Sequence, residues 1–407
     1  KCYAAFSGGL FTIIFKNNIY IVIARISILL FLLILVPDVY LYRRYVVRRT
    51  TLHPLWRWLW WIPATVLTLY TVVLCCLPGF APTQTVWLNA YLLMLALLGF
   101  PKVVLALCMA IGKLVKQLSH TRRNYGVAVG TLLASLVPVG VLYGAFWGVR
   151  QLQVRYVDLA FDDLPAAFEG YRLVHITDLH SGTLPPDLLQ RAVDSINAQH
   201  PDAVMITGDV QNLLPTEITP LMPQYRRIQA RHDVFAVLGN HDYGTYVHTS
   251  EQEKLRNEAA TIAAERQCGW KVLLNQHVVL RQGTDSIVVA GTENEGRPPF
   301  PAKANWQGAL GGVGKGAFVI MLQHDPWAWE HSILPKTQAQ LTLSGHTHGG
   351  QVSIFGWRFT QINNREDCGL YRQQQRALYV SSGLGGFLPF RLGVVPEIVV
   401  ITLHRSA

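Results

Sequence analysis

Four long apolar stretches in the first 150 residues constrain the fold of this chain more than any other feature. They cover about residues 19–42, 59–79, 86–111 and 126–148, and each is near the ~20 residues that a bilayer-spanning helix needs. Backbone polar groups inside a bilayer must bond within their own segment, so we predict four transmembrane helices and a transmembrane domain over residues 1–150. The alternative is that one or two of these stretches are buried helices of a soluble domain.

The charge of the chain is divided as sharply as its hydropathy. The first 150 residues contain 14 Lys or Arg and one acidic residue, Asp38, whereas the rest contains 21 basic and 24 acidic residues. The formal net charge of +10 therefore comes from the apolar part and does not indicate a nucleic-acid partner. Arg25 and Asp38 lie inside the first apolar stretch, where ionisable side chains are rare and usually functional. An alternative is that the helices form a transporter or a receptor with a regulatory soluble domain, but these two residues alone give that alternative little support.

Basic residues in the short loops predict the orientation of the helices. Residues 43–58 contain five Arg and residues 112–125 contain four Lys or Arg, whereas the loop APTQT between the second and third stretches contains none. Because basic loops stay in the cytoplasm, the segment after residue 148 should emerge on the opposite face. We therefore expect an integral protein of the bacterial inner membrane with a periplasmic or extracellular second domain. A cleaved signal peptide does not fit, since each stretch exceeds the ~7–15 residues of its apolar core.

At about residue 151 the pattern changes to short apolar runs separated by Gly, Pro and Asn. Eight runs predict buried strands that each end in a polar loop: LVHITD, AVMITGD, VFAVLGNHD, IVVAGTEN, AFVIMLQHD, QLTLSGHTH, ALYVSSG and EIVVITL. Helical patterns occupy residues 185–199, 218–229 and 250–267, and the last begins with SEQE in the arrangement of a capping box. Strands that first alternate with helices and then follow one another predict an α/β domain over residues 151–407 with more than one sheet.

Polar clusters with metal-ligand character follow five of these runs, at the strand ends where the sites of α/β folds gather. Asp178 and His180 are two residues apart, so an oxygen and a nitrogen donor would project to the same side of an extended strand. Such a mixed pair suits a first-row divalent metal. Asp209 follows Gly208, which lets the backbone turn sharply, and its carboxylate has two oxygens to share between two cations. Each cluster in isolation also fits an ordinary turn or surface position. The prediction of a metal site therefore depends on the whole set of clusters and on their order along the chain.

The sequence GNHD offers three polar side chains after the third run. Asn240 provides a neutral amide oxygen as a ligand, and His241 provides a proton donor or a phosphate contact. We expect the carboxylate of Asp242 to orient the imidazole of His241, as second groups commonly do beside catalytic histidines. Gly-Asn is also an ordinary turn signal, but the adjacent His-Asp pair favours a site.

Three further histidines complete the set of nitrogen donors. His346 and His348 lie in the sequence GHTHGG at a strand end, where glycines on both sides leave room for a metal and a substrate. His324 stands alone in MLQHD, and a lone histidine is more often structural than ligating. The other histidines of the second domain lack such a context, and we expect them to be structural.

Taken in order, the motifs D-x-H, G-D, G-N-H-D, H and G-H-T-H resemble those of the calcineurin-like metallophosphoesterases over essentially all of residues 173–403. The tail YVSSGLGGFLPFRLGVVPEIVVITL is similar to membrane-associated bacterial phosphodiesterases and UDP-2,3-diacylglucosamine hydrolases. This resemblance implies an α/β/β/α sandwich of two mixed sheets and a centre of two divalent cations (Mn, Fe or Zn). The implied ligands are Asp178, His180, Asp209 and His348 for one cation, and Asp209, Asn240, His324 and His346 for the other.

By the same resemblance, His241 would contact the phosphate and protonate the leaving oxygen, with Asp242 behind it. Many relatives have Glu at the latter position, and Asp keeps the charge but shortens the reach. Two cations ~3.5–4 Å apart polarise a water toward hydroxide and neutralise charge at phosphorus, so no Ser or Cys nucleophile is needed. We expect a membrane-anchored phosphodiesterase or pyrophosphohydrolase that acts on a lipid-linked or envelope phosphoester. The alternatives are a nucleotidase or phosphomonoesterase, and a binding module without activity.

Two further features of the second domain have more than one interpretation. Cys268 and Cys368 would form a disulfide if they met in an exported domain, which their spacing does not decide. Residues 297–316 are rich in Gly, Pro and basic residues, and they form either a loop near the site or a disordered connector.

Overall fold

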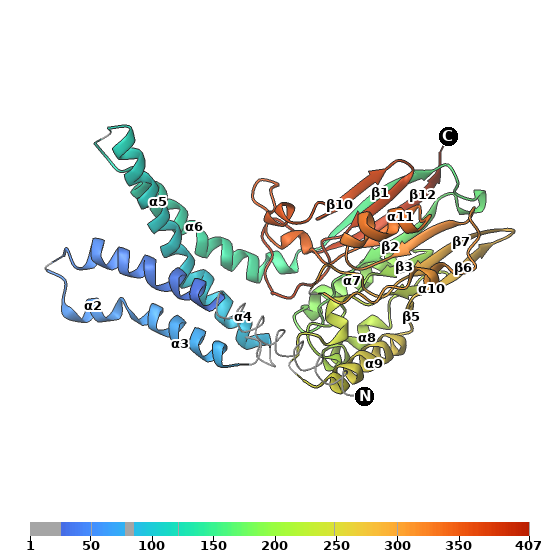
Figure 1. The fold of residues 1–407 in the computed structure, drawn as a ribbon, viewed down its shortest axis with the longest axis horizontal. Helices are drawn as coiled ribbons and strands as arrows, with labels where there is room; N and C mark the ends of the chain where they lie inside the picture. The colour runs from blue at the N-terminus through green and yellow to red at the C-terminus, as the bar shows by residue number, and fades with distance from the viewer. Residues whose placement is uncertain are drawn as a thin grey trace, which may run out of the picture. The chain divides into compact units, whose positions relative to one another are not determined.

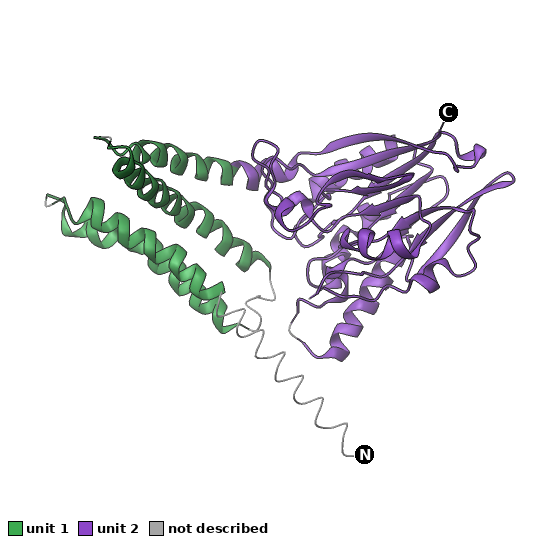
Figure 2. Cartoon of the chain, turned by 45° about the horizontal axis from the view of Figure 1, so that its top comes forward, with its two compact units in different colours: residues 1–142 green, residues 143–407 purple. Residues whose placement is uncertain are grey.

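The computed structural model describes residues 26–406, apart from residues 50, 78–84, 121, 248 and 299. The chain divides into two compact units, residues 1–142 and 143–407 (Figure 2). Arg25 and the beginning of the first apolar stretch lie outside the described residues.

Four helices among the described residues are long and apolar enough to span a membrane, which confirms the four predicted spans. They are Ile26–Val46, Pro54–Cys76, Thr85–Leu118 and Gly126–Arg150. Figure 1 labels within them α2 (Pro54–Leu59), α3 (Ile62–Cys76), α4 (Thr85–Met94), α5 (Phe100–Leu118) and α6 (Gly126–Phe146). The third span extends beyond its predicted end at residue 111, because residues 112–118 contain no Pro and mostly good helix formers.

Asp38, the acidic residue of the first span, is buried and paired within the first unit. Its carboxylate accepts a hydrogen bond of 2.6 Å from Nζ of Lys102. The ammonium of Lys102 also lies 5.2 Å from the centroid of the Trp60 ring, where a cation is attracted to the aromatic face. Opposite charges within a membrane bundle commonly pair in this way. The pair thus gives Asp38 a structural role that requires no ion pathway.

The second unit contains two mixed sheets, each of six strands among the described residues (Figure 1). The strand order is β1-β12-β2-β3-β4-β5 in the first sheet and β10-β11-β9-β8-β7-β6 in the second. Parallel pairing runs from β2 to β5 in the first sheet and joins β7, β8, β9 and β11 in the second. The bounds are β1 Gln153–Phe161, β2 Tyr171–Ile176, β3 Ala203–Ile206, β4 Val234–Ala236, β5 Lys271–Val272, β6 Gln276–Gln282, β7 Asp285–Gly291, β8 Phe318–Leu322, β9 Leu341–Ser344, β10 Gly369–Gln373, β11 Arg376–Val380 and β12 Glu397–Arg405.

Three apolar layers hold the sheets and helices together. Side chains from both sheets, such as Phe235 and Phe318, form the core between them. The outer face of the first sheet packs against α7 (Pro186–Ala198), α8 (Met222–Tyr225) and α9 (Glu251–Gln267). The outer face of the second packs against α10 (Trp306–Leu310) and α11 (Leu334–Lys336). This arrangement confirms the expected α/β/β/α sandwich of two mixed sheets.

All eight apolar runs are strands, and the four strands that the sequence did not predict are the edges of the two sheets: β1, β5, β10 and β6. An edge strand has one neighbour and often a solvated face, so its sequence lacks a continuous apolar run. In β1, for example, only two of nine residues are buried. The sequence analysis therefore missed these four strands because they lie at the edges of the sheets.

One local expectation needs correction, and the structure answers the question of the two cysteines, which their spacing left open. The predicted helix over residues 218–229 is two short turns, Thr219–Leu221 and α8, because Pro220 and Pro223 cannot continue a hydrogen-bonded helix. Cys268 and Cys368 both carry free thiols, so the disulfide is not formed. At the start of α9, the side chain of Ser250 accepts a hydrogen bond from the backbone N–H of Glu253, as the N-cap residue of a helix does.

Candidate metal centre

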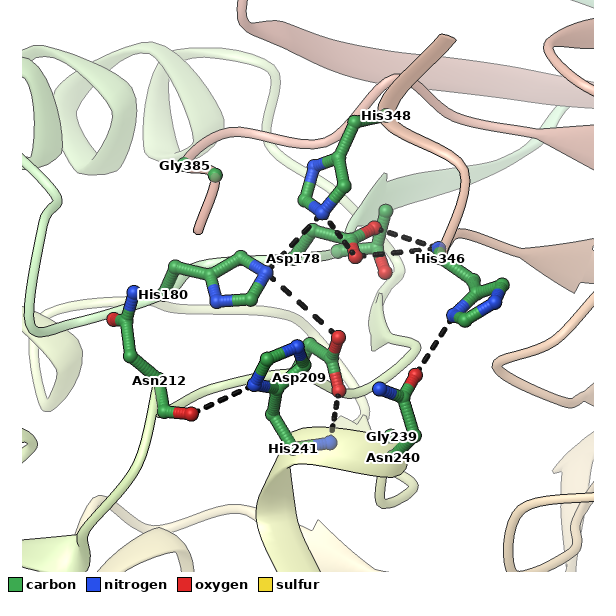
Figure 3. Close-up of polar contacts among 12 residues, drawn as sticks. Asp178, His180, Asp209, Asn212, Gly239, Asn240, His241, His346, His348 and Gly385 are labelled. Atoms are coloured by element: carbon green, nitrogen blue, oxygen red, sulfur yellow. Dashed lines mark hydrogen bonds and ion pairs between the residues drawn. The ribbon is translucent and has the colours of Figure 1, made fainter. Parts of the chain in front are cut away.

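The predicted ligands come together although they lie on loops that are far apart in the sequence. Figure 3 labels all of them except His324. The first sheet contributes the loops after β2, β3 and β4, which carry Asp178, Asp209 and Asn240. The second sheet contributes the loops after β8 and β9, which carry His324 and the pair of histidines in GHTH. The carboxyl ends of both sets of parallel strands thus meet at one edge of the sandwich, as expected for a site in this class of fold.

One group of donors is formed by Asp178, His180 and His348. Their donor atoms lie within 4.8 Å of one another. Nε2 of His348 is 3.4 Å from Oδ1 of Asp178 and 3.2 Å from Nε2 of His180. Two imidazole nitrogens and a carboxylate oxygen that converge so closely have a spacing that fits a shared cation.

A second group of donors is formed by Asp209, His324 and His346, again within 4.8 Å. Nε2 of His324 lies 3.2 Å from Oδ2 of Asp209. The amide oxygen of Asn240 lies 2.7 Å from Nδ1 of His346 and 3.1 Å from Nε2 of His324. The same Oδ2 of Asp209 is 3.7 Å from Nε2 of His180 in the first group, so Asp209 stands between the two groups.

Burial keeps two of these histidines neutral. Desolvation is the main cause that lowers the pKa of His180 and of His348 well below the ordinary value; Arg391 acts in the same direction, and the carboxylate of Asp209 opposes it. Neither Nδ1 atom has a hydrogen-bond partner among the described residues. Two neutral imidazoles that aim their Nε2 atoms at each other, with carboxylates beside them, have the protonation state and the direction that a bound divalent cation requires.

The backbone around the donors is strained. Five of the seven predicted ligands have a positive φ between 47° and 72°, namely Asp178, His180, Asp209, His346 and His348. A residue other than Gly adopts this conformation at a cost of about 1–3 kcal/mol, and such residues gather at functional sites. Gly345 allows the close approach of the loops, since a Cβ there would overlap Asp178 and Thr177. The sandwich therefore holds the donors in positions that the local sequence alone would not favour.

Asp242 does not orient the imidazole of His241, and that expectation is wrong. Its carboxylate accepts hydrogen bonds from the backbone N–H groups of Asp209 (2.8 Å), Val210 (3.0 Å), Gln211 (3.2 Å) and Gly239 (2.8 Å). The short side chain of Asp242 lies against the loop after β3, and backbone N–H groups of that loop occupy both of its carboxylate oxygens. Asp242 thus holds the backbone of the loop that carries Asp209.

The imidazole of His241 is instead held by groups that sequence reasoning missed. Its Nδ1 is 2.7 Å from the carbonyl oxygen of Asn212 (Figure 3), so the hydrogen bond between the ring and the described residues is made at Nδ1 and not at Nε2. The ring stacks on Tyr246 with centroids 4.2 Å apart and lies 5.5 Å from the ring of Phe387. The backbone contact of Asn212 has no sequence signal, whereas Phe387 belongs to the tail whose sequence is similar to the membrane-associated phosphodiesterases.

Two more residues near the second group were not predicted. Oδ2 of Asp325 lies 3.7 Å from Nε2 of His346, and its position directly after His324 was the available signal. Phe300 places its ring edge-on to His346, with centroids 4.8 Å apart. Residues 297–316, for which a site loop and a connector were both considered, therefore contribute at least one side chain to the site.

Two family models match the chain. One is described as "Probable Calcineurin-like phosphoesterase, transmembrane domain" and matches residues 24–149, and the other as "Calcineurin-like phosphoesterase" and matches residues 171–350. The chain belongs to the calcineurin-like phosphoesterases. It is a membrane protein and a phosphoester hydrolase, and its family implies divalent metal ions.

Relatives of this phosphoesterase include proteins with and without an assigned substrate. It is 28% identical over 355 residues to the "Transmembrane protein with metallophosphoesterase domain" of Danio rerio, a match that covers 81% of this chain and 77% of that one. The "Uncharacterized metallophosphoesterase YkuE" of Bacillus subtilis is 28% identical over 316 residues, with 72% and 100% covered. The "UDP-2,3-diacylglucosamine pyrophosphatase LpxG" of Chlamydia trachomatis is 28% identical over 295 residues, with 59% and 86% covered. The predicted similarity to the UDP-2,3-diacylglucosamine hydrolases is confirmed.

Proposed function

We propose that the two donor groups bind two divalent cations and that this phosphoesterase hydrolyses a phosphodiester or pyrophosphate bond with water. The observation that carries the proposal is the position of Asp209, whose carboxylate lies 3.7 Å from His180 and 3.2 Å from His324, one residue in each group. Bound cations supply Lewis-acid polarisation of a water and neutralise charge at phosphorus. The mixed Asp, Asn and His donors suit Mn, Fe or Zn.

The remaining roles in this mechanism belong to His241 and Asp242. With Nδ1 held by the carbonyl of Asn212, the imidazole of His241 presents Nε2 to the substrate and donates a proton to the leaving oxygen. Such general-acid assistance is typically worth ~10²–10⁴ in rate. Asp242 keeps Asp209 in place through the backbone of its loop.

The substrate that fits best is a lipid-linked or envelope phosphoester. Four helices of membrane-spanning length precede the hydrolase domain, and the Chlamydia relative is named as a UDP-2,3-diacylglucosamine pyrophosphatase, whose substrate carries two acyl groups. The basic loops favour the bacterial inner membrane with the hydrolase domain on the periplasmic face. Protease protection in spheroplasts tests this orientation, since cleavage of residues 151–407 by added protease is expected only if the domain is exported.

A comparison of Asp209→Asn with the unaltered full-length protein tests the proposal. Metal content is measured by elemental analysis, and hydrolysis is measured with an aryl phosphodiester and an aryl monoester. Exposed Asp187, on α7, provides the matched control Asp187→Asn. We expect Asp209→Asn to lose metal and at least 100-fold in activity while the control keeps both. Full activity in Asp209→Asn would remove its bridging role, and a preference for the monoester would favour a phosphomonoesterase.

A further inference from the structure

An exposed apolar hairpin, residues 352–362, follows the metal centre directly and has no part in the chemistry above. Phe355 is fully exposed, and Trp357 and Ile362 are 55% and 72% exposed. Ile354 and Phe359 are exposed as well. Single exposed apolar residues are common on a water-facing surface, but five large ones within nine residues form a patch. Such patches mark interaction sites.

The hairpin has a defined conformation. The backbones of Ile354 and Trp357 exchange two hydrogen bonds of 3.0 Å around a tip formed by Phe355 and Gly356, both with positive φ. Arg358 donates to both carboxylate oxygens of buried Asp367, at 2.7 and 2.9 Å. Its apolar side chains are therefore presented by a fixed loop, visible in orange beside β10 in Figure 1.

Backbone hydrogen bonds connect the base of the hairpin to the end of the last membrane helix. The N–H of Ser353 donates to the carbonyl of Leu392 at 2.7 Å. One residue earlier, the N–H of Arg391 donates to the carbonyl of Gly144 in α6 at 3.1 Å. Residues 143–150 belong to the same compact unit as the hairpin. The base of the hairpin is thus bonded to Leu392, and the neighbouring residue, Arg391, is bonded to α6.

The same end of α6 has the side chains of a membrane–water interface. Tyr143, Phe146 and Trp147 are 42%, 53% and 63% exposed. Aromatic side chains are enriched at this level of membrane helices because they combine an apolar body with a polar edge. The bilayer surface is therefore expected beside residues 143–147, close to where the hairpin is anchored.

We propose that residues 352–362 insert their apolar side chains into the surface of the bilayer that holds α6. The continuity with α6 favours the bilayer over a second copy of the chain or another protein. The composition agrees, because the hairpin carries no acidic residue and its one basic residue, Arg358, is neutralised by Asp367. Phe and Trp, here Phe355 and Trp357, are side chains that interfacial segments use.

Insertion would also bring the metal centre to the lipid surface. The hairpin begins four residues after His348, and Nε2 of Gln351 donates at 2.8 Å to the carbonyls of Leu388 and Phe390. The loop so held carries Phe387, which lies against His241. This second step rests on the proposed function: a phosphoester attached to a lipid would reach the site without leaving the bilayer surface.

Photo-cross-linking of the full-length protein in nanodiscs tests the insertion without requiring activity. The variant Phe355→p-benzoylphenylalanine is irradiated in discs of phosphatidylcholine and phosphatidylglycerol, and lipid adducts are counted by mass spectrometry. The matched control is Leu255→p-benzoylphenylalanine, at a 63% exposed apolar position on α9. We expect at least fivefold more lipid adduct at position 355. Equal yields at both positions, or a covalent dimer in place of lipid adducts, would overturn the proposal.

Kinetics of Phe355→Ser combined with Trp357→Ser test the link to the substrate. We expect kcat/KM for a lipid-linked phosphodiester in vesicles to fall at least tenfold, with kcat/KM for a soluble aryl phosphodiester unchanged. An equal loss on both substrates would overturn the guiding role of the hairpin. Absence of any hydrolysis by the unaltered protein would count against the proposed function alone, because the lipid adducts at position 355 are measured independently.

Discussion

The carboxylate of Asp242 accepts hydrogen bonds of 2.8 Å from the backbone N–H groups of Asp209 and Gly239, and so joins the loops after β3 and β4. Charge-assisted hydrogen bonds of this kind are stronger than neutral ones. The position of the Asp209 carboxylate therefore depends on Asp242, whose carboxylate is hydrogen-bonded to backbone N–H groups, while the neighbouring imidazole of His241 is bonded to the carbonyl of Asn212.

Replacement of Asp242 by Ala should weaken metal binding and activity by about 10–100-fold, as is typical for groups that orient ligands. The backbone N–H groups of the loop would lose their acceptor, and Asp209 would lose its fixed position. Asp242→Asn keeps one acceptor oxygen and should have a smaller effect. Calorimetric titration with Mn²⁺ measures the affinity, and an unchanged dissociation constant in Asp242→Ala would contradict the role assigned here.

Replacement of His241 by Gln should lower kcat by ~10²–10⁴ and leave the metal content unchanged, because its proposed role is to donate a proton. Elemental analysis of the purified variant provides the second measurement. Loss of metal would show a different role, since the donor atoms of His241, His180 and Asp209 also lie within 4.8 Å of one another.

Replacement of Asp38 by Asn should destabilise the transmembrane helices by about 1–3 kcal/mol, because the ammonium of Lys102 would lose its charged partner in an apolar environment. The double variant with Lys102→Met removes both charges and should recover most of the loss. Thermal unfolding in detergent measures both variants. An Asp38→Asn protein as stable as the unaltered one would mean that the pair contributes little.

Glu265 on α9 should make the stability of the protein fall as the pH rises. Burial, reinforced by the negative charge of Asp242, raises the pKa of Glu265 well above its ordinary value of 4.5, and neither carboxylate oxygen has a hydrogen-bond partner among the described residues. The folded state therefore holds a proton that the unfolded state releases above pH 4.5. The contribution of Glu265 to stability is greatest below that pH and declines by about 1.4 kcal/mol per pH unit until the folded pKa is reached.

The variant Glu265→Gln isolates this effect, since Gln does not titrate. Thermal unfolding at pH 5 and pH 8 should show a smaller loss of stability in the variant than in the unaltered protein. Glu251, at the exposed start of α9, provides the control Glu251→Gln, which should behave as the unaltered protein does. The same pH dependence in Glu265→Gln and in the unaltered protein would mean that Glu265 is ionised in the folded state.

Prediction from the sequence worked where the signal is local. The four membrane helices and the eight interior strands are continuous apolar runs, and the clusters DLH, GD, GNHD and GHTH directly follow such runs. It failed for the edge strands and for the helix at residues 218–229. Edge strands lack an apolar run, and the two prolines in the predicted helix outweigh its periodicity.

The sequence by itself determined which side chains are available as metal donors and where each follows a strand, because strand pattern and donor spacing are properties of a few consecutive residues. Only the tertiary structure decided what each side chain contacts: that Asp242 supports the loop of Asp209, that a carbonyl at Asn212 holds His241, and that the hairpin at Phe355 is anchored beside α6. These contacts join segments tens to hundreds of residues apart, and their geometry follows from how the two sheets pack.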